Sequence, residues 1–359
     1  MKSILDNQAL VEKLDQQNMR GSIRQLDKQI SQVWAERQKI NLTTIKKRGV
    51  KQVVVAGMGG STLGMHVLKS VFAQMLSVPV EVVNDYTLPA YVDKQTLVLA
   101  SSYSGSTEEV LSAWAAAEAK QASLVALTSG GRLADLARQA KKPLFLFNPE
   151  HNPCRSPRMG LGYMLFGQLA IFSQLGLIKV TDREVKQVIS VIKKYNKIFG
   201  LDQPSKTNPA KKLALLTPQR SVWYLAAEHL IGSAHVAANQ LNENGKRFGG
   251  YFALPELNHH LLEGLLHPVS NQKNVLFILL SSVSYCPANQ RRVQLTKELI
   301  DKNKVRVAEY AVQEKRRLDA ALEVLVLSSY LSYYAAILTG IDPTAIPFVD
   351  QLKKRLARR

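Results

Sequence analysis

Acidic, basic and histidine side chains gather in one segment, "QLNENGKRFGGYFALPELNHH", which spans residues 240–260. Glu243 lies between two asparagines in this segment, and His259 lies near its end. A carboxylate can remove a proton from carbon and a histidine can carry a proton at neutral pH, so Glu243 is a candidate general base and His259 a candidate proton shuttle. The same residue types also occur in turns and helix caps. The segment is therefore either an active site or a capping loop.

A glycine-rich turn, "VVVAGMGGSTLG", occupies residues 53–64. The predicted strand ends at Gly57. Two more glycines, Gly59 and Gly60, come after it, and Ser61 is expected to be the N-cap of a helix. Backbone N–H groups and the helix dipole would converge there, which suits a bound anion. The third glycine of a dinucleotide fingerprint is missing, and no Gly-Lys-Ser/Thr of a nucleotide-binding P-loop follows. The turn therefore predicts an anion site of a different kind, or simply a tight turn.

A second turn, "LASSYSGSTEEVL" at residues 99–111, is rich in hydroxyl groups. Its hydroxyl side chains are those of Ser101, Ser102, Ser104, Ser106 and Thr107. One structural interpretation is a capping box, with Ser106 as the N-cap and Glu109 three residues later, or the same motif in a neighbouring register. Neutral donors at a helix N-terminus also suit a phosphate group. Because both turns follow predicted parallel strands, they should meet at one edge of a sheet, and together they indicate a phosphate site.

The remainder of the chain alternates short β-rich runs with helical stretches, which is typical of a parallel sheet covered on both faces. Strands are predicted at 52–57, 80–85, 96–102, 123–129, 143–148, 221–227, 274–282 and 305–312, and helices at 61–76, 107–120, 131–140, 162–177 and 317–339. The fold class is therefore α/β, with two tandem α/β units. We predict an N-terminal helical extension at 1–47, a first domain at 48–150, a helical connector at 151–212, and a second domain with C-terminal helices at 213–359.

Composition limits the functional classes. Of the 359 residues, 46% are hydrophobic and 21% are charged, which indicates a globular protein, and the two cysteines favour a reducing cytoplasm. The net charge of +19 admits a nucleic-acid partner, a solvated basic surface or attraction of an anionic substrate. No recognition motif supports nucleic-acid binding. The apolar run at 322–341 contains serines and tyrosines and is interpreted as a buried core helix, so no membrane association is expected.

With these blocks together, the sequence resembles the bifunctional phosphoglucose/phosphomannose isomerase family, which has the sugar isomerase (SIS) fold. The matching pieces are "GMGGS", "SSYSGSTEE", "SPRMGLGY", "LNENGK", "PELNHH" and "GIDPTAIPFVDQLKK", in the family's order from residue 53 to residue 354. The resemblance implies two tandem SIS-type domains, each a mostly parallel sheet flanked by helices. It also implies a homodimer with shared active sites, a sugar phosphate substrate and no cofactor or metal.

The resemblance assigns roles to individual residues. Residues Gly60, Ser61, Ser102, Ser104 and Thr107 would bind the sugar phosphate. Glu243 matches the catalytic glutamate, and His259 matches a ring-opening histidine contributed by the partner subunit. Arg158 matches the arginine that faces the enediolate. In the family a lysine near the C-terminus assists ring opening. We assign this lysine to Lys353, and the adjacent Lys354 is the alternative assignment.

The chain departs from the family's pattern at several positions. The family commonly has His-Asn where this chain has His259 and His260, and it has smaller residues where this chain has Met65 and His66. The family's usual arginine upstream of the glutamate block is also missing. These changes put the choice between glucose and mannose epimers in doubt more than the fold. They leave open a divergent enzyme.

The chemistry that fits these residues is aldose–ketose isomerisation, which moves a proton between C1 and C2 through a cis-enediolate. It needs a carboxylate base, a cation beside the developing oxyanion, and an acid–base pair to open the sugar ring. The expected activity is the interconversion of glucose 6-phosphate and fructose 6-phosphate, with mannose 6-phosphate as a further candidate substrate. The alternative is a non-catalytic SIS-fold sensor or regulator that binds a phosphosugar.

Overall fold

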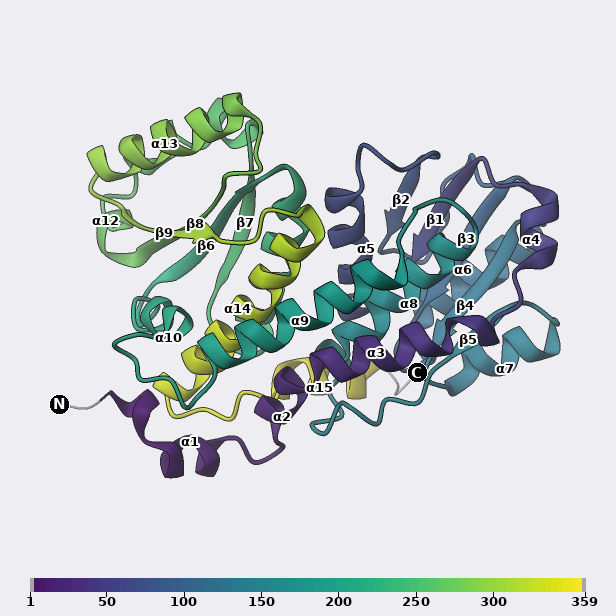
Figure 1. The fold of residues 1–359 in the computed structure, drawn as a ribbon, viewed down its shortest axis with the longest axis horizontal. Helices are drawn as coiled ribbons and strands as arrows, with labels where there is room; N and C mark the ends of the chain where they lie inside the picture. Colours follow the sequence, from purple (N-terminus) through teal and green to yellow (C-terminus); the bar gives the residue numbers. More distant parts are fainter. Residues whose placement is uncertain (1–2, 357–359) are drawn as a thin grey trace.

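The computed structural model describes residues 3–356, and the chain begins with a series of short helices (Figure 1). After a 3₁₀ turn at Ile4–Asp6 come α1 (Gln8–Leu14), α2 (Met19–Arg24), α3 (Leu26–Glu36), a 3₁₀ turn at Arg37–Lys39 and α4 (Thr43–Arg48). The amphipathic α3 buries Leu26, Ile30 and Val33, and it packs along α8 and α9 of the connector. The N-terminal segment is therefore a helical layer along the long axis of the molecule.

The first sheet contains five parallel strands in the order β2-β1-β3-β4-β5. They are β1 (Gln52–Ala56), β2 (Val80–Val83), β3 (Thr96–Ser101), β4 (Ser123–Thr128) and β5 (Leu144–Leu146), connected in part by α5 (Gly60–Val71), α6 (Glu108–Ala119) and α7 (Gly131–Gln139). Every residue of β3 and β4 is buried, as expected for central strands with helices on both faces. The predicted strands and helices of this domain are confirmed.

A helical connector joins the two sheets. It consists of a 3₁₀ turn at Pro157–Met159, α8 (Leu161–Gln174), α9 (Asp182–Phe199) and α10 (Pro209–Ala214). A complete capping box begins α9, where Thr181 and Glu184 satisfy each other's backbone N–H groups. The capping box predicted from Ser106 and Glu109 was wrong. Helix α6 begins after Thr107 instead, and the Thr107 hydroxyl is bonded to Ser102.

The second sheet contains four parallel strands in the order β7-β6-β8-β9, which repeats the order of the first four strands of the first sheet. They are β6 (Ser221–Ala227), β7 (Gly249–Leu254), β8 (Val275–Ser282) and β9 (Arg306–Val312), with α11 (Ile231–Glu243), α12 (Asn271–Asn274), α13 (Pro287–Lys302) and α14 (Arg317–Leu338), and with 3₁₀ turns at Glu228–Leu230, Glu256–His259 and Glu263–Leu265. The sequence did not predict β7, whose two leading glycines read as a loop. The predicted domain boundaries at 47, 150 and 212 stay predictions.

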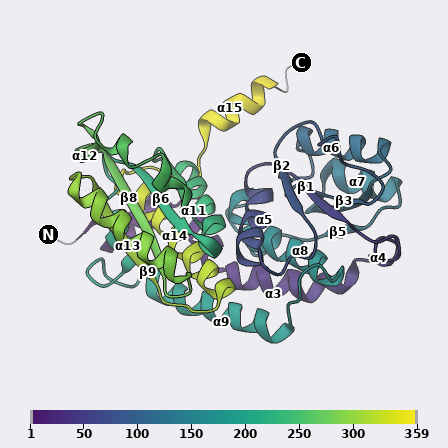
Figure 2. The same cartoon turned by 90° about the horizontal axis from the view of Figure 1, so that it is seen from above.

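The last two helices differ in their surroundings. By length and composition α14 could cross a membrane, but 94% of its apolar window is buried inside the protein, in agreement with its interpretation as a core helix. By contrast, α15 (Pro347–Leu356) has no buried residue and projects away from both sheets (Figure 2). Its exposed apolar side chains include Phe348 and Leu352.

Helices α5 and α11 pack against each other and join the two sheets at the centre of the molecule. The rings of His66 on α5 and His235 on α11 lie 4.5 Å apart within this interface. Burial, together with the neighbouring His235 and Lys69, lowers the pKa of His66 to about 4, so the ring is neutral near pH 7. Met65 is fully buried in the core. The unusual pair at 65 and 66 therefore serves helix packing.

Candidate functional site

A cavity of about 520 Å³ opens where the first sheet, the connector and α11 meet. Predicted site residues that line it are Gly60, Ser61, Ser104, Thr107, Arg158, Glu243 and Lys353, and the other lining residues include Met58, Tyr103, Glu109, Asn239 and Asn242. The predicted residues come from five separate segments of the chain. The structure thus brings seven of the nine together, and it leaves Ser102 and His259 outside the lining.

The two serine–glycine turns form one wall of this cavity. Helix α5 has Gly59 as its N-cap, so the prediction that Ser61 is the N-cap was wrong, and Ser61 instead lies inside the first turn. The Ser61 hydroxyl accepts a hydrogen bond from the Tyr103 backbone N–H at 3.0 Å, which links the first turn to the second. A Cβ at Gly60 would lie 3.1 Å from the Arg158 Cα, so glycine allows the connector to approach closely.

The second turn is held in shape from within. Ser102 is buried, and its hydroxyl contacts the Thr107 hydroxyl at 2.9 Å and accepts from the Gly105 N–H at 3.0 Å. Gly105 has φ of +69°, and a Cβ there would lie 1.8 Å from the Gly130 carbonyl oxygen, so no other residue fits. Ser104 and Thr107 remain at the cavity. Ser102 therefore shapes the turn, while Ser104 and Thr107 are placed to reach a ligand.

Glu243 enters the cavity from the last residue of α11 and is partly exposed. Asn239 lies one turn earlier on the same face of this helix and also lines the cavity. The sequence analysis passed over Asn239, although its spacing of one helical turn from Glu243 was the available signal. Asn242 lines the cavity as well, and its amide donates to the Ala238 and Gly249 carbonyls, so it also holds the end of α11 against β7.

Arg158 is almost completely enclosed, with 6% of its surface exposed. Its Nε donates to Asn244 Oδ1 at 2.6 Å and one terminal nitrogen to Ser156 Oγ at 2.6 Å. The other terminal nitrogen donates to the Pro343 and Thr344 carbonyls at 3.3 and 2.7 Å. Burial lowers the pKa of Arg158 and the nearby Glu243 raises it. A guanidinium remains charged under these conditions, so the cavity has a fixed cation beside Glu243.

Two neighbours of Glu243 support this arrangement and were underestimated in the sequence analysis. Asn244 is fully buried and fixes the Arg158 side chain, whereas the sequence suggested a turn residue. The Lys246 ammonium donates to the Glu243 carbonyl at 2.8 Å and to the Pro343 carbonyl at 2.7 Å. Burial and the charge of Arg158 lower the pKa of Lys246 to about 8. The segment around Pro343 is therefore held by two cations.

The tail beyond this anchor brings α15 to the mouth of the cavity. Ile346, Val349 and Lys353 line the cavity, whereas Lys354 does not. This placement favours the predicted register at Lys353. Lys353 is exposed on a helix that has no buried residue. Its position therefore depends on how the Pro343 and Thr344 carbonyls are held by Arg158 and Lys246.

His259 is exposed and lies in the 3₁₀ turn at Glu256–His259, outside the cavity that contains Glu243 of the same chain. The adjacent His260 pairs with Glu256 at 2.8 Å, and its ring lies 5.9 Å from the Phe252 ring. The unusual histidine at position 260 is therefore engaged on the surface next to β7.

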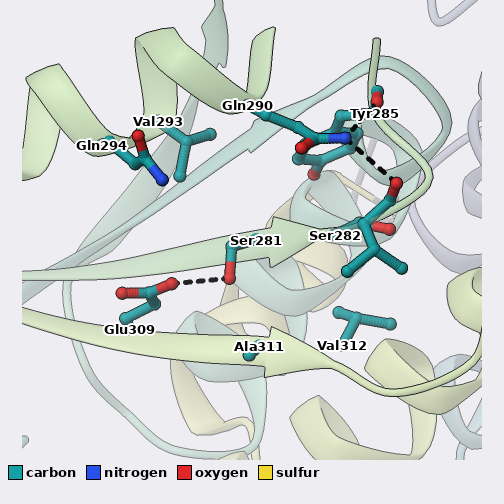
Figure 3. A pocket seen from close by; sticks show the side chains of 10 residues that line it. Ser281, Ser282, Tyr285, Gln290, Val293, Gln294, Glu309, Ala311 and Val312 are labelled. Atoms are coloured by element: carbon teal, nitrogen blue, oxygen red, sulfur yellow. Dashed lines mark hydrogen bonds between the residues drawn. The ribbon is translucent and has the colours of Figure 1, made fainter. Parts of the chain in front are cut away.

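The second sheet has a smaller hollow, of about 260 Å³, at the carboxyl ends of β8 and β9 (Figure 3). The Ser281 hydroxyl points across to Glu309 and donates to it at 2.7 Å. Among the described residues that line this hollow there is no cation, and the nearby Lys297 is already paired with Glu309 at 2.8 Å. A phosphate there would meet the Glu309 carboxylate and no free cation, which disfavours a phosphate site. Of the two equivalent sheet edges, the one on the first sheet therefore suits a phosphate.

A carboxylate of the second domain, that of Glu228, lies at the N-terminus of α13. Glu228 accepts from the Cys286 backbone N–H and from Asn289 Nδ2, both at 2.8 Å. Arg317 lies 3.7 Å away, and these donors hold the pKa of Glu228 below its usual range although its partial burial opposes this. The N-terminus of α13 therefore already has an anion.

No group of three or more histidine, cysteine or acidic side chains within residues 3–356 is arranged to hold a metal ion. The groups that line the main cavity are a carboxylate base, a fixed guanidinium, hydroxyls at a helix N-terminus and a lysine. Together they can hold an anionic ligand and transfer a proton beside it.

Comparison with known protein families agrees with this architecture. A family described as the bacterial phospho-glucose isomerase C-terminal SIS domain matches residues 206–356, and the SIS domain family matches residues 48–166. Among solved structures, tagatose-6-phosphate ketose/aldose isomerase from Escherichia coli has a TM-score of 0.68 at 16% identity, with 96% of this chain and 98% of that chain covered. Glucosamine-6-phosphate deaminase from Thermotoga maritima has a TM-score of 0.62 at 16% identity, with 91% and 97% covered. At these identities the likeness shows the fold.

Curated relatives are more similar in sequence. The bifunctional phosphoglucose/phosphomannose isomerase of Caldicellulosiruptor bescii is 32% identical over 345 residues, which cover 94% of this chain and 98% of that protein. The protein of the same name from Aquifex aeolicus is 27% identical, with 86% and 91% covered. With two SIS domains and a relative of this identity along nearly its whole length, the chain belongs to the bifunctional phosphoglucose/phosphomannose isomerase family.

Proposed function

We propose that this chain is an aldose–ketose isomerase that interconverts glucose 6-phosphate or mannose 6-phosphate with fructose 6-phosphate. The observation that supports this most is that the Glu243 carboxylate, the Arg158 guanidinium and the two serine–glycine turns line one cavity. The names of the curated relatives support the substrate class. A base beside a phosphate site and a fixed cation is the arrangement that an enediolate mechanism needs.

In this mechanism the substrate phosphate binds at the N-terminus of α5 and the hydroxyls of Ser104 and Thr107. The Glu243 carboxylate removes the proton from C2 of the aldose and returns it to C1, which yields the ketose. The negative charge that develops on the enediolate oxygens is stabilised by Arg158. Four hydrogen bonds occupy the guanidinium, which has five N–H groups, so one N–H remains to face the oxygen.

Ring opening is assigned to Lys353 of the same chain and to His259 of a second copy. The support for a partner copy is that His259 is exposed and lies outside the cavity of its own chain. Phe248, just before β7, is 75% exposed, and Phe348 on α15 is 85% exposed, so the molecule presents apolar side chains that a partner could cover. We therefore propose a homodimer with shared active sites.

We place the enzyme in the cytoplasm. Cys154 and Cys286 are both free thiols, as expected in a reducing compartment. The excess of basic residues then serves at most to attract an anionic substrate, and we propose no nucleic-acid or membrane partner.

The test of the proposed reaction is the Glu243→Gln variant in an assay that couples glucose 6-phosphate formation to a dehydrogenase. Loss of the base should reduce kcat by about 10²–10⁴-fold. The Glu256→Gln variant, which changes an exposed carboxylate of the same segment, is the matched control and should retain activity. If wild type and Glu243→Gln show equal trace turnover while glucose 6-phosphate still raises the melting temperature, the protein is a phosphosugar sensor and the proposal is wrong.

The same variant tests the shared site. Glu243→Gln and His259→Gln protomers are each expected to be inactive. When they are unfolded together and refolded as a mixture, mixed dimers have one intact site, so about a quarter of the wild-type activity should return if association is random. Mixtures that stay inactive would show that both residues act within one chain.

A further inference from the structure

A second large cavity, of about 540 Å³, lies between the N-terminal helices and α9, away from the site described above. Five cationic side chains line it, those of Arg20, Arg24, Lys28, Lys193 and Lys197, against the two carboxylates of Asp27 and Asp202. The lining residues come from α2, α3 and the end of α9, whose places in the fold are seen in Figure 1. Tyr330 of α14 also lines the cavity. The cavity therefore has a net positive charge and is built from four helices.

Three of the five cations have no partner among residues 3–356. Arg20 lies 3.2 Å from Glu12, and Lys193 lies 3.9 Å from Asp27. Arg24, Lys28 and Lys197 make no ion pair or side-chain hydrogen bond with any residue in the described part of the chain. Like charges gathered in a concave site repel one another, and a bound anion would relieve that repulsion.

A tyrosine hydroxyl group also faces this cavity. Tyr330 has 1% of its surface exposed, and its hydroxyl has no hydrogen-bond partner among residues 3–356. Burial raises the pKa of this hydroxyl. The charges of Arg24 and Arg20 lower that pKa and the charge of Asp202 raises it, so the charged groups that act on the hydroxyl are residues of the cavity. The Tyr330 hydroxyl is therefore available to donate to a ligand in the cavity.

Asn196 of α9 connects two of the helices that line the cavity. Its amide donates to the Arg24 carbonyl at 3.2 Å and thereby joins α9 to α2. Arg24 and Lys197 therefore line the cavity from the two helices that this contact joins.

From this geometry we propose that the cavity between α2, α3 and α9 binds a small ligand with two or more adjacent phosphate groups. Arg24 and Lys28 bind one end of the ligand, Lys197 binds the other, and the Tyr330 hydroxyl donates to it from the floor. The volume is in the range of small-molecule sites, about 300–1,000 Å³. A nucleic-acid strand would instead need exposed aromatic faces, whereas the Tyr330 ring is buried beside the Tyr334 ring, 5.9 Å away.

The site is also connected to the loop that contains Arg158. The Cys154 N–H donates to Ser22 Oγ on α2 at 3.1 Å, and Gln29 Nε2 on α3 donates to the Met159 carbonyl at 3.0 Å. A ligand that joins α2 and α3 to α9 would therefore hold the helices that support this loop. Binding of the ligand can be measured directly, without an assay of enzymatic activity.

Inorganic pyrophosphate is the probe, titrated calorimetrically into the full chain. The Arg24→Glu/Lys197→Glu variant should bind it at least about tenfold more weakly, because two attractive charges become repulsive. The control, Lys46→Glu/Lys47→Glu, has the same change in net charge on the exposed face of α4, and it should differ from wild type by less than about twofold. Tyr330→Phe removes a single hydroxyl and should weaken binding about two- to tenfold.

Four outcomes would overturn the proposal. One is equal weakening by the cavity variant and the α4 control, which would indicate general charge attraction. Another is loss of pyrophosphate binding in a Ser61→Ala/Thr107→Val variant with retention in the cavity variant, which would place the ligand in the first cavity. A third is tighter binding of a short single-stranded RNA than of pyrophosphate. Orthophosphate should bind more weakly than pyrophosphate, and equal binding would also contradict a site for adjacent phosphates.

Discussion

Substitution of Arg158 by lysine keeps the positive charge but removes the planar guanidinium. In the structure Arg158 serves four acceptors, on Ser156, Asn244, Pro343 and Thr344, at 2.6–3.3 Å. A lysine has three donors at a single nitrogen, so at least one acceptor loses its partner, and none remains to face the substrate.

The expected effects have different sizes. A buried acceptor that loses its partner costs about 1–3 kcal/mol, so the unfolding free energy should fall by about that amount. Loss of one preorganised donor to a developing oxyanion costs about 10²–10³-fold in kcat. Because Arg158 also holds the Pro343 and Thr344 carbonyls, the tail that contains Lys353 should become more accessible to proteases.

The measurements are the coupled isomerase assay, chemical denaturation and limited proteolysis of α15. Arg155 is exposed, lies three positions earlier and provides the matched control, since Arg155→Lys should leave all three readouts unchanged. If Arg158→Lys retains kcat/KM within about threefold of wild type, the one remaining N–H does not act on the enediolate and the reasoning fails. Loss of stability with full activity would restrict Arg158 to holding the tail.

Two further predictions concern Lys246 and Gly105. The pKa of Lys246 is lowered from 10.5 to about 8, so between these values the unfolded chain binds more protons and the folded protein gains stability as pH rises. Chemical denaturation should therefore show that the unfolding free energy of the wild type increases between pH 8 and pH 10.5, and that this increase is missing in Lys246→Met. The same dependence of unfolding free energy on pH in both proteins would contradict the prediction. Gly105→Ala should lower the melting temperature and weaken phosphate binding, because its Cβ would meet the Gly130 carbonyl at 1.8 Å, whereas Gly264→Ala, with open space around it, should not. An unchanged melting temperature for Gly105→Ala would show that the turn can shift.

Much of the fold could be predicted because parallel strands are nearly continuous apolar runs with helical stretches between them. The strands at 96–102 and 123–129 were found in this way, and in the structure the corresponding β3 and β4 are wholly buried. Strand β7 was missed because Gly249 and Gly250 weaken the local strand signal, and pairing with β6 along its whole length compensates for it.

The sequence by itself determined the chemical groups of the site, since Glu243, Ser104 and Thr107 stand out by type and by neighbouring residues, and the family resemblance adds Arg158. Tertiary structure decided which of them share a cavity and what holds them there. Asn244 looked like a turn residue, yet burial makes it the partner of Arg158. The basic cavity beside Tyr330 gave no signal in the sequence, because its charges come from helices far apart along the chain and meet only when α2, α3, α9 and α14 pack together.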